Sequence, residues 1–150
     1  MSNWTDLETT IAARVALEPA FRSVYSAAAV GLVSPTSWPS ALITVLRGKT
    51  IDRSAVMGAI YVTKRVEFQV LIGTRMSGAA GESRLQTGGV WELYDKLQAK
   101  LLGFVPKLTV PPVAIWPCIE EDFFLDLLEP GAVDLDVLWS VDVKLQHPAA

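Results

Sequence analysis

The sequence predicts an α+β fold, in which an antiparallel or mixed sheet of about four to five strands carries two main helices packed on one face. Three observations support this class. Residues 59–75 and 133–145 alternate apolar and polar side chains at the period of a half-buried strand. Residues 5–18 and 88–102 instead place apolar side chains at helical spacing. Helical and strand patterns also follow one another along the chain, which favours helices gathered on one face of a sheet.

Length and composition indicate one domain over residues 1–150. A chain of this size can bury a substantial core but seldom forms two domains. Hydrophobic residues make up 51% of it and charged residues only 19%. Either the core is large or other subunits cover part of the apolar surface.

The N-terminal region predicts a helix from Thr5 to Glu18, capped by Thr5 or Asn3 and stopped by Pro19. Its apolar positions recur every four residues, at Leu7, Ile11 and Val15. Residues 20–30 fit either a strand or a helical extension, and we favour the strand. Two prolines make residues 34–40 a loop, after which residues 41–48 form an apolar strand of the type buried on both faces.

Residues 49–58 are interpreted as a hairpin loop that is longer than a tight turn requires. Arg47, Lys49 and Arg53 surround this loop. We expect them to contact a neighbouring subunit or the structure on which the protein assembles, while an ordinary solvated turn is an equally simple alternative.

The central unit consists of the strand 59–75, a break of small residues and a helix from Gly88 to Leu102. Gly103 and Pro106 form a normal helix stop. The glycines of the break match neither the phosphate-binding loop nor the dinucleotide fingerprint, so the break is a loop. The expected apolar stripe of the helix is Val90, Tyr94, Leu97, Leu101 and Phe104.

The C-terminal third begins with a proline-rich extended segment, which allows at most an edge strand around residues 108–110. Residues 119–128 predict one or two helical turns, because three apolar side chains recur every four residues behind an acidic start. The last strand places apolar residues from Val133 to Leu145 on one face. A flexible tail is expected after about residue 145.

Charge is distributed unevenly although the net charge is only −3. Residues 1–107 hold 12 basic and 8 acidic side chains, whereas residues 108–143 hold 8 acidic and no basic ones. Ordinary solvated surface is the simpler explanation. The functional alternative is an acidic surface that faces a basic surface of a neighbouring copy, or that lines a channel and repels nucleic acid phosphates.

No catalytic, cofactor-binding or metal-binding residues are expected. The single histidine, His147, lies in the expected tail, and Cys118 has neither a second cysteine nor a nearby histidine in the sequence to form a metal or nucleophile pair. Adjacent acids at 120–122 do not have the ligand spacing of a calcium loop. No apolar run is long enough to span a bilayer, so we expect no membrane association.

Several segments together resemble the tail terminator, or tail-completion, proteins of Mu-like and other long-tailed phages and prophages. A strand, a small-residue loop and a leucine-rich helix that ends in Leu-x-Gly-aromatic-x-Pro carry the resemblance, with an earlier strand before them. The matching residues are Val66–Gly73, Gly89–Gly103, Phe104–Pro106 and Leu42–Leu46.

The resemblance implies a structural virion protein without enzymatic activity or cofactor. Such a protein assembles in the host cytoplasm as a ring, commonly a hexamer, and caps the head-proximal end of the tail tube. It ends polymerisation of the tube protein and joins the tube to the head-side connector, while DNA passes through without specific binding.

One further expectation concerns the channel of such a ring. Asp134, Asp136 and Asp142 share the polar side of the last strand, and a DNA passage should be acidic or neutral because basic side chains would bind phosphates. We therefore expect these acids to face the lumen, with the outer wall as the alternative.

Two other functions remain open: another head-to-tail joining or neck protein, and a small ligand-binding or enzymatic α+β domain.

Overall fold

The computed structural model describes residues 3–27, 37–75, 89–129 and 132–148. The break of small residues expected after residue 75 lies outside these ranges, as do residues 34–36 of the loop expected at 34–40. The elements in chain order are α1 (Asn3–Val15), β1 (Ser23–Ser26), β2 (Ser40–Val56), β3 (Ala59–Arg75), α4 (Val90–Leu101), β4 (Ala114–Ile115), β5 (Ile119–Glu129) and β6 (Ala132–Pro148). The α+β class is confirmed, with a six-stranded mixed sheet in place of four to five strands.

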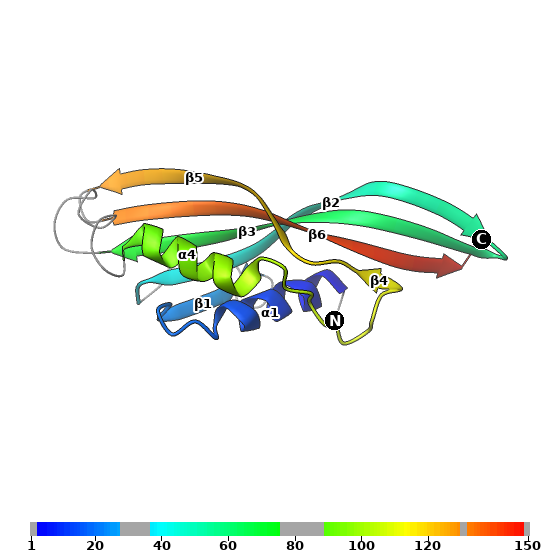
Figure 1. The fold of residues 1–150 in the computed structure, drawn as a ribbon, viewed down its shortest axis with the longest axis horizontal. Coiled ribbons are helices and arrows are strands. Elements are labelled where there is room, and N and C mark those ends of the chain that lie inside the picture. The colour runs from blue at the N-terminus through cyan, green and yellow to red at the C-terminus, as the bar shows by residue number, and fades with distance from the viewer. Residues whose placement is uncertain (1–2, 28–36, 76–88, 130–131, 149–150) are drawn as a thin grey trace.

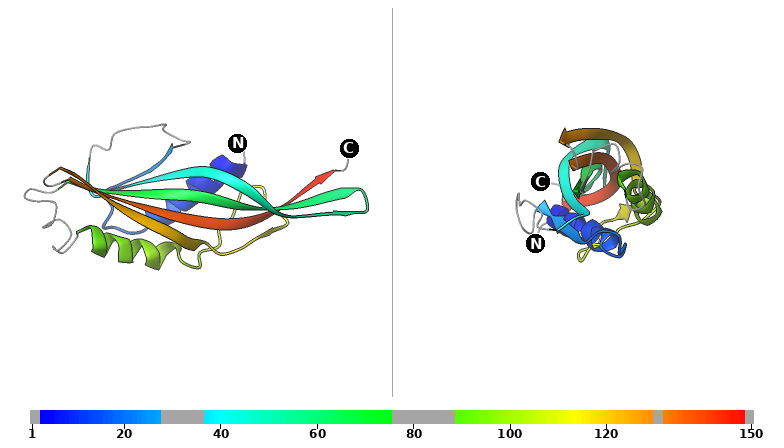
Figure 2. Two further views of the ribbon diagram at one scale, coloured as in Figure 1. Left: turned by 90° about the horizontal axis from the view of Figure 1, so that it is seen from above. Right: turned by 90° about the vertical axis from the view of Figure 1, so that its left-hand side faces the viewer.

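Three strands of 17 residues form the centre of the sheet. β3 pairs antiparallel with β2 on one side and along its whole length with β6 on the other. β1 adds to β2 in parallel, which makes the sheet mixed. β5 and β4 pair with successive parts of β6. The sheet curls strongly when viewed from its end (Figure 2).

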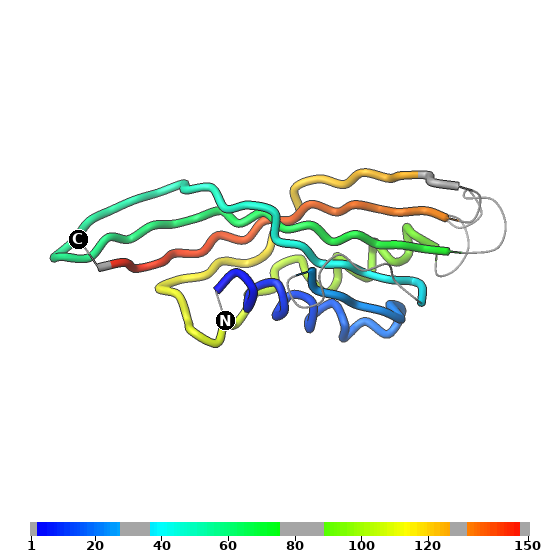
Figure 3. Tube along the Cα trace, turned by 180° about the vertical axis from the view of Figure 1, so that it is seen from behind, coloured from blue at the N-terminus to red at the C-terminus, as the bar shows by residue number. Residues whose placement is uncertain are grey.

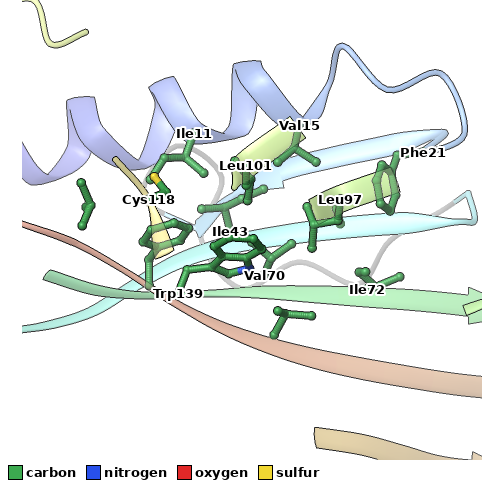
Figure 4. Close-up of a cluster of buried hydrophobic side chains, with 14 of the residues drawn as sticks. Ile11, Val15, Phe21, Ile43, Val70, Ile72, Leu97, Leu101, Cys118 and Trp139 are labelled. Carbon is green, nitrogen blue, oxygen red and sulfur yellow. The ribbon is translucent and has the colours of Figure 1, made fainter. Parts of the chain in front are cut away.

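Both helices lie on one face of the sheet, and the core fills the space between (Figures 1 and 4). The apolar side chains of the two alternating strands are buried beneath the helices, among them Val66, Phe68, Val70, Val137, Trp139 and Val141. Phe68 and Trp139 stack with ring centroids 6.5 Å apart. The predicted helix-on-sheet packing is therefore confirmed. In α4, Leu93 occupies the buried position that the sequence reading assigned to Tyr94.

A buried carboxylate joins α1 to the sheet. Glu8 is only 4% exposed, and its oxygens accept hydrogen bonds from the Ser26 hydroxyl at 2.7 Å and the Val45 backbone N–H at 2.8 Å. β1 pairs with β2 only as far as Ile43. The Glu8 side chain therefore supplies an acceptor where the neighbouring strand has ended, and satisfies a backbone donor that would otherwise lose its partner.

Replacing Glu8 by Ala should lower the free energy of unfolding by about 1 to 3 kcal/mol, because the Val45 N–H loses its buried acceptor. Urea denaturation followed by tryptophan fluorescence measures this change. The matched control is Glu8→Gln, whose amide oxygen still accepts from Val45 and which should lose less. An Ala variant within about 0.5 kcal/mol of the parent would show that this contact does not stabilise the fold.

The expected long hairpin loop at residues 49–58 is wrong, because β2 continues through it to Val56. The turn consists of Met57 and Gly58, which have φ angles of 50° and 81°. Positive φ at both central residues is typical of a two-residue hairpin turn, for which Asn-Gly is the usual signal. Beyond Leu46 the strand is exposed on both faces, so no period-2 pattern reveals it.

The helical turns expected at 119–128 are also wrong, since these residues form β5. β6 offers a backbone edge with which this segment pairs from Ile119 to Glu129, with a bulge near Glu120. Phe123 also packs against α4, with its ring 5.8 Å from that of Trp91 and 5.5 Å from that of Tyr94. Tertiary pairing thus overrides a local helical spacing.

Two smaller corrections concern the chain around α4 and the C-terminus. The proline-rich segment contributes its short strand at Ala114–Ile115, not at 108–110. The last strand runs to Pro148, so residues 146–148 pair with β3 where a flexible tail was expected. Gly103 follows α4 with φ of 79°, as the predicted helix stop requires.

Candidate assembly surfaces

Residues 46–65, the far half of the β2–β3 hairpin, extend past the helices and are called the arm here (Figures 1 and 3). Every β2 residue from Leu46 to Val56 is exposed. The arm is held by its own backbone ladder and by pairing with β6, not by the core beneath the helices. Such a projection adds little to the stability of the monomer but offers a long surface for contact.

The arm is basic, with five basic side chains and one acidic one: Arg47, Lys49, Arg53, Lys64, Arg65 and Asp52. Two of them are paired. Arg47 binds Glu67 through Nε at 2.6 Å and Nη2 at 3.3 Å, and Arg65 binds Asp142 through two bonds at 3.0 and 3.1 Å. Hydrogen bonding to Arg47 lowers the pKa of Glu67. Within the described ranges, Lys49, Arg53 and Lys64 have no ion pair.

The three arm residues predicted as contacts do not converge on one point. Directly paired residues of antiparallel strands share a face. Arg47 is opposite Glu67 and Lys49 is opposite Arg65, so both lie on the face away from the helices. Arg53 is opposite Val62 and lies on the other face, because a bulge between Thr50 and Asp52 shifts the alternation. All three stand on strand β2, not on a loop as expected.

The tip of the arm is apolar. Met57 is 99% exposed, and Val56 and Ile51 are 54% and 41% exposed. Methionine is also an unusual residue at a φ of 50°, a conformation that favours glycine or asparagine. Met57 is thus a fully exposed apolar side chain at a sterically unfavourable turn position. Contact with another molecule would explain both properties.

The acids predicted to line a channel lie together on the sheet face away from the helices, and each has a partner. Arg75 donates to Asp134 at 3.0 Å, Gln69 donates to Asp136, and Arg65 holds Asp142. The face is therefore nearly charge-balanced along β3 and β6, and not a bare acidic row. The sequence reading missed these pairs because the partners are 59 to 77 residues away along the chain.

β5 forms a second exposed surface that sequence reasoning did not find. The sequence of β5 contains five acidic residues and no basic one, and of these acids Glu121, Asp122 and Asp126 are exposed. Ile119, Phe123 and Phe124 are 56%, 47% and 66% exposed. Phe123 and Phe124 also border a shallow cavity of about 230 Å³ that reaches Leu46 and Leu138. The exposed surface of β5 is thus both acidic and apolar.

Two of the β5 acids are bound within the subunit. Gln98 donates to Glu120 at 3.3 Å, and Ser140 donates to Glu121. Within the described residues, Asp122 accepts a hydrogen bond only from the backbone N–H of Phe123, and both Asp122 and Asp126 are exposed. These two carboxylates are therefore open to a cationic partner.

Cys118 connects α4 to β5 through its backbone and is chemically protected. Its N–H donates to Phe104 O at 2.8 Å, and its carbonyl accepts from Gly103 at 3.1 Å. Burial raises the pKa of its thiol to about 12. Because the thiolate is the nucleophile, this side chain is unsuited to covalent chemistry near neutral pH. Among the described residues, no cluster of three or more His, Cys, Asp or Glu is arranged to hold a metal ion.

The folded protein should therefore leave Cys118 unmodified by a thiol-specific maleimide at pH 8, while the urea-unfolded chain reacts stoichiometrically. Mass spectrometry of the labelled protein checks this. Because the pKa is raised in the folded state, this group also disfavours folding as pH increases above about 9, the usual thiol value. Rapid stoichiometric labelling of the native chain would contradict the buried position.

Neither α1 nor α4, the helices of the described chain, has the length and apolar character needed to cross a membrane.

No protein-family model matches the chain, and no curated protein matches it. A solved structure does match: a chain from the virion of a native gene transfer agent particle, with a TM-score of 0.58 and 13% sequence identity. The match covers 93% of this chain and 95% of that one, so the two proteins share their fold over nearly their whole length.

Proposed function

We propose that this protein is a structural subunit of a phage or phage-like virion, a tail terminator that forms a ring on the head-proximal end of the tail tube. The fold shared with a virion chain over 93% of the present sequence carries the proposal. The sequence resemblance to tail terminators supplies the finer role. We propose no enzymatic activity, and the partners are other copies, the tail tube protein and the head-side connector.

The exposed surfaces support a subunit designed to assemble. The arm projects past the helices with an apolar tip, and the exposed surface of β5 lies elsewhere on the same sheet. A closed ring needs two different surfaces on each copy, one for each neighbour. A hexamer follows from the family resemblance.

In this ring the sheet face away from the helices borders the DNA passage. Ion pairs support that placement, because an arginine bound to a carboxylate is less available to bind a phosphate. Arg65 and Arg75 are both held in this way by Asp142 and Asp134. A structure of the assembled ring tests the placement, and a lumen lined by the helices would overturn it.

Deletion of the gene from its phage tests the terminator role. Particles should then carry tails of uncontrolled length without attached heads, and adding the purified protein to polymerising tube protein should shorten the tubes. Negative-stain images should show a ring at one tube end. Tails of normal length that merely lack heads would instead indicate the neck protein alternative. Normal, infectious particles would contradict both.

A further inference from the structure

The arm and β5 carry opposite charges on otherwise similar apolar surfaces. The arm holds Lys49, Arg53 and Lys64 without ion pairs in the described chain, next to exposed Ile51 and Val56. β5 holds exposed Asp122 and Asp126 next to exposed Phe123 and Phe124. The positive charges of the arm thus complement the negative charges of β5, and contact would bury apolar side chains on both surfaces.

The backbone of both segments is also open along one edge. β1 pairs with β2 only from Ser40 to Ile43, and Glu8 takes the N–H of Val45. From Leu46 to Val56, β2 has no strand neighbour on that side among the described residues. β5 likewise pairs only with β6. Long open edges with exposed apolar side chains are ready to pair with another strand.

Within one copy, Leu46 at the base of the arm borders the same cavity as Phe123 and Phe124, but the rest of the arm runs away from β5. The arm extends to one end of the elongated molecule, while β5 runs along the sheet toward the other end, as both side views show (Figures 1 and 3). β3 and β6 also lie between β2 and β5 in the sheet. The complementary surfaces are therefore available to two different neighbours, which is the condition for a head-to-tail contact.

We propose that the arm of one copy docks along β5 of the next copy and extends its sheet, with Lys49 facing Asp122 and Asp126, which like Lys49 lie on the sheet face away from the helices. Repeated around a rotation axis, this contact closes a ring. The inference rests on the proposed ring and identifies the surfaces from which it is built. The apolar tip at Met57 then lies against the neighbour, which accounts for its full exposure in the single subunit.

Charge reversal on each side tests the contact. The arm variant is Lys49→Glu, and the β5 variant is Asp122→Lys with Asp126→Lys. Like charges opposed across an interface weaken binding strongly, so each variant should raise the dissociation constant for self-association by about a hundredfold. The chain that carries all three substitutions should recover assembly, because opposite charges again face one another across the contact. Sedimentation velocity at a series of concentrations measures all of them.

The matched control reverses one exposed basic residue outside both surfaces, Lys107→Glu, and should assemble as the parent does. Circular dichroism and urea denaturation verify that each variant is folded. Met57→Asn supplies a test without charge: asparagine suits the positive φ of the turn, so the monomer should be no less stable while assembly weakens.

Cross-linking identifies the geometry independently. Lys49→Cys and Asp126→Cys are prepared as separate variants, and Cys118 stays in place because it is buried. Mixed, they should form a covalent dimer with a short bis-maleimide, whereas each alone should not. A mixture of Lys107→Cys with Asp126→Cys is the control. Cross-linking of Lys49→Cys to itself would indicate a two-fold contact and overturn the head-to-tail arrangement.

The outcomes separate this inference from the ring proposal. Rings that form equally well with either charge reversal would overturn the arm-to-β5 contact and leave the ring intact. A parent chain that remains monomeric at low salt and high concentration would overturn both. The proposed contact would also be wrong if the arm bound only the tube protein and the β5 variant left self-association unchanged.

Discussion

Replacing Phe68 by Ala is expected to lower the free energy of unfolding by about 3 to 5 kcal/mol. The ring is fully buried on the helix-facing side of β3 and stacks on Trp139. Its removal leaves a cavity beneath both helices that the long, fully paired strands cannot readily close. Urea denaturation at a concentration where the protein is monomeric measures the loss.

Leu97 provides a second measurement on the other side of the same core. It is 0% exposed, whereas Leu102, just after the same helix, is 60% exposed. Leu97→Ala should cost about 2 to 5 kcal/mol, and Leu102→Ala, which removes the same atoms, should stay within about 0.5 kcal/mol of the parent. Losses under about 1 kcal/mol for both Phe68→Ala and Leu97→Ala would contradict the packing of the helices on this face.

Joint substitution of Arg47, Lys49 and Arg53 by Ser is expected to abolish most self-association while the monomer keeps its stability. The bond from Arg47 to Glu67 is a surface ion pair, and its arginine side chain is 71% exposed. Such pairs contribute about 0 to 1 kcal/mol to folding. Loss of three positive charges from the arm should instead weaken assembly by tenfold or more, which corresponds to at least about 1.4 kcal/mol.

Thermal denaturation and sedimentation on the same preparation separate the two effects. The control is the joint substitution of Lys96, Lys100 and Lys107 by Ser, which removes equal charge from outside the arm. Unfolding of the arm variant would show that these residues stabilise the monomer. Normal assembly of the variant would show that they do not contribute to self-association. A similar loss of assembly in the control would point to net charge alone.

Local pattern was sufficient where one face of an element meets the core. β3 and β6 alternate because the helices cover one side of the sheet and solvent meets the other, and the sequence shows that alternation directly. The apolar spacing of α1 and of α4 predicted both helices and their buried faces. The glycine after α4 marked its end for the same local reason, a positive φ.

The sequence pattern failed to predict strands that the core covers on neither face, or on only part of one face. In the arm, β2 has exposed side chains on both faces and so carries no alternation, and the turn contains methionine in place of asparagine. In β5, the four-residue spacing of Ile119 and Phe123 resembled a helix, but pairing with β6 decided the structure. Propensity is a weak prior beside a full backbone ladder.

For the candidate surfaces too, some features were evident from the sequence and others only from the structure. The sequence by itself determined the absence of a recognised catalytic motif, the excess of acids after residue 107 and the shared polar side of Asp134, Asp136 and Asp142. Only the tertiary structure decided that each of these three acids has a partner on β3, and that an acidic β5 and a basic arm lie on different parts of one sheet. Pairing partners across a sheet are set by strand register, which depends on contacts far apart in the chain and leaves no local trace in the sequence.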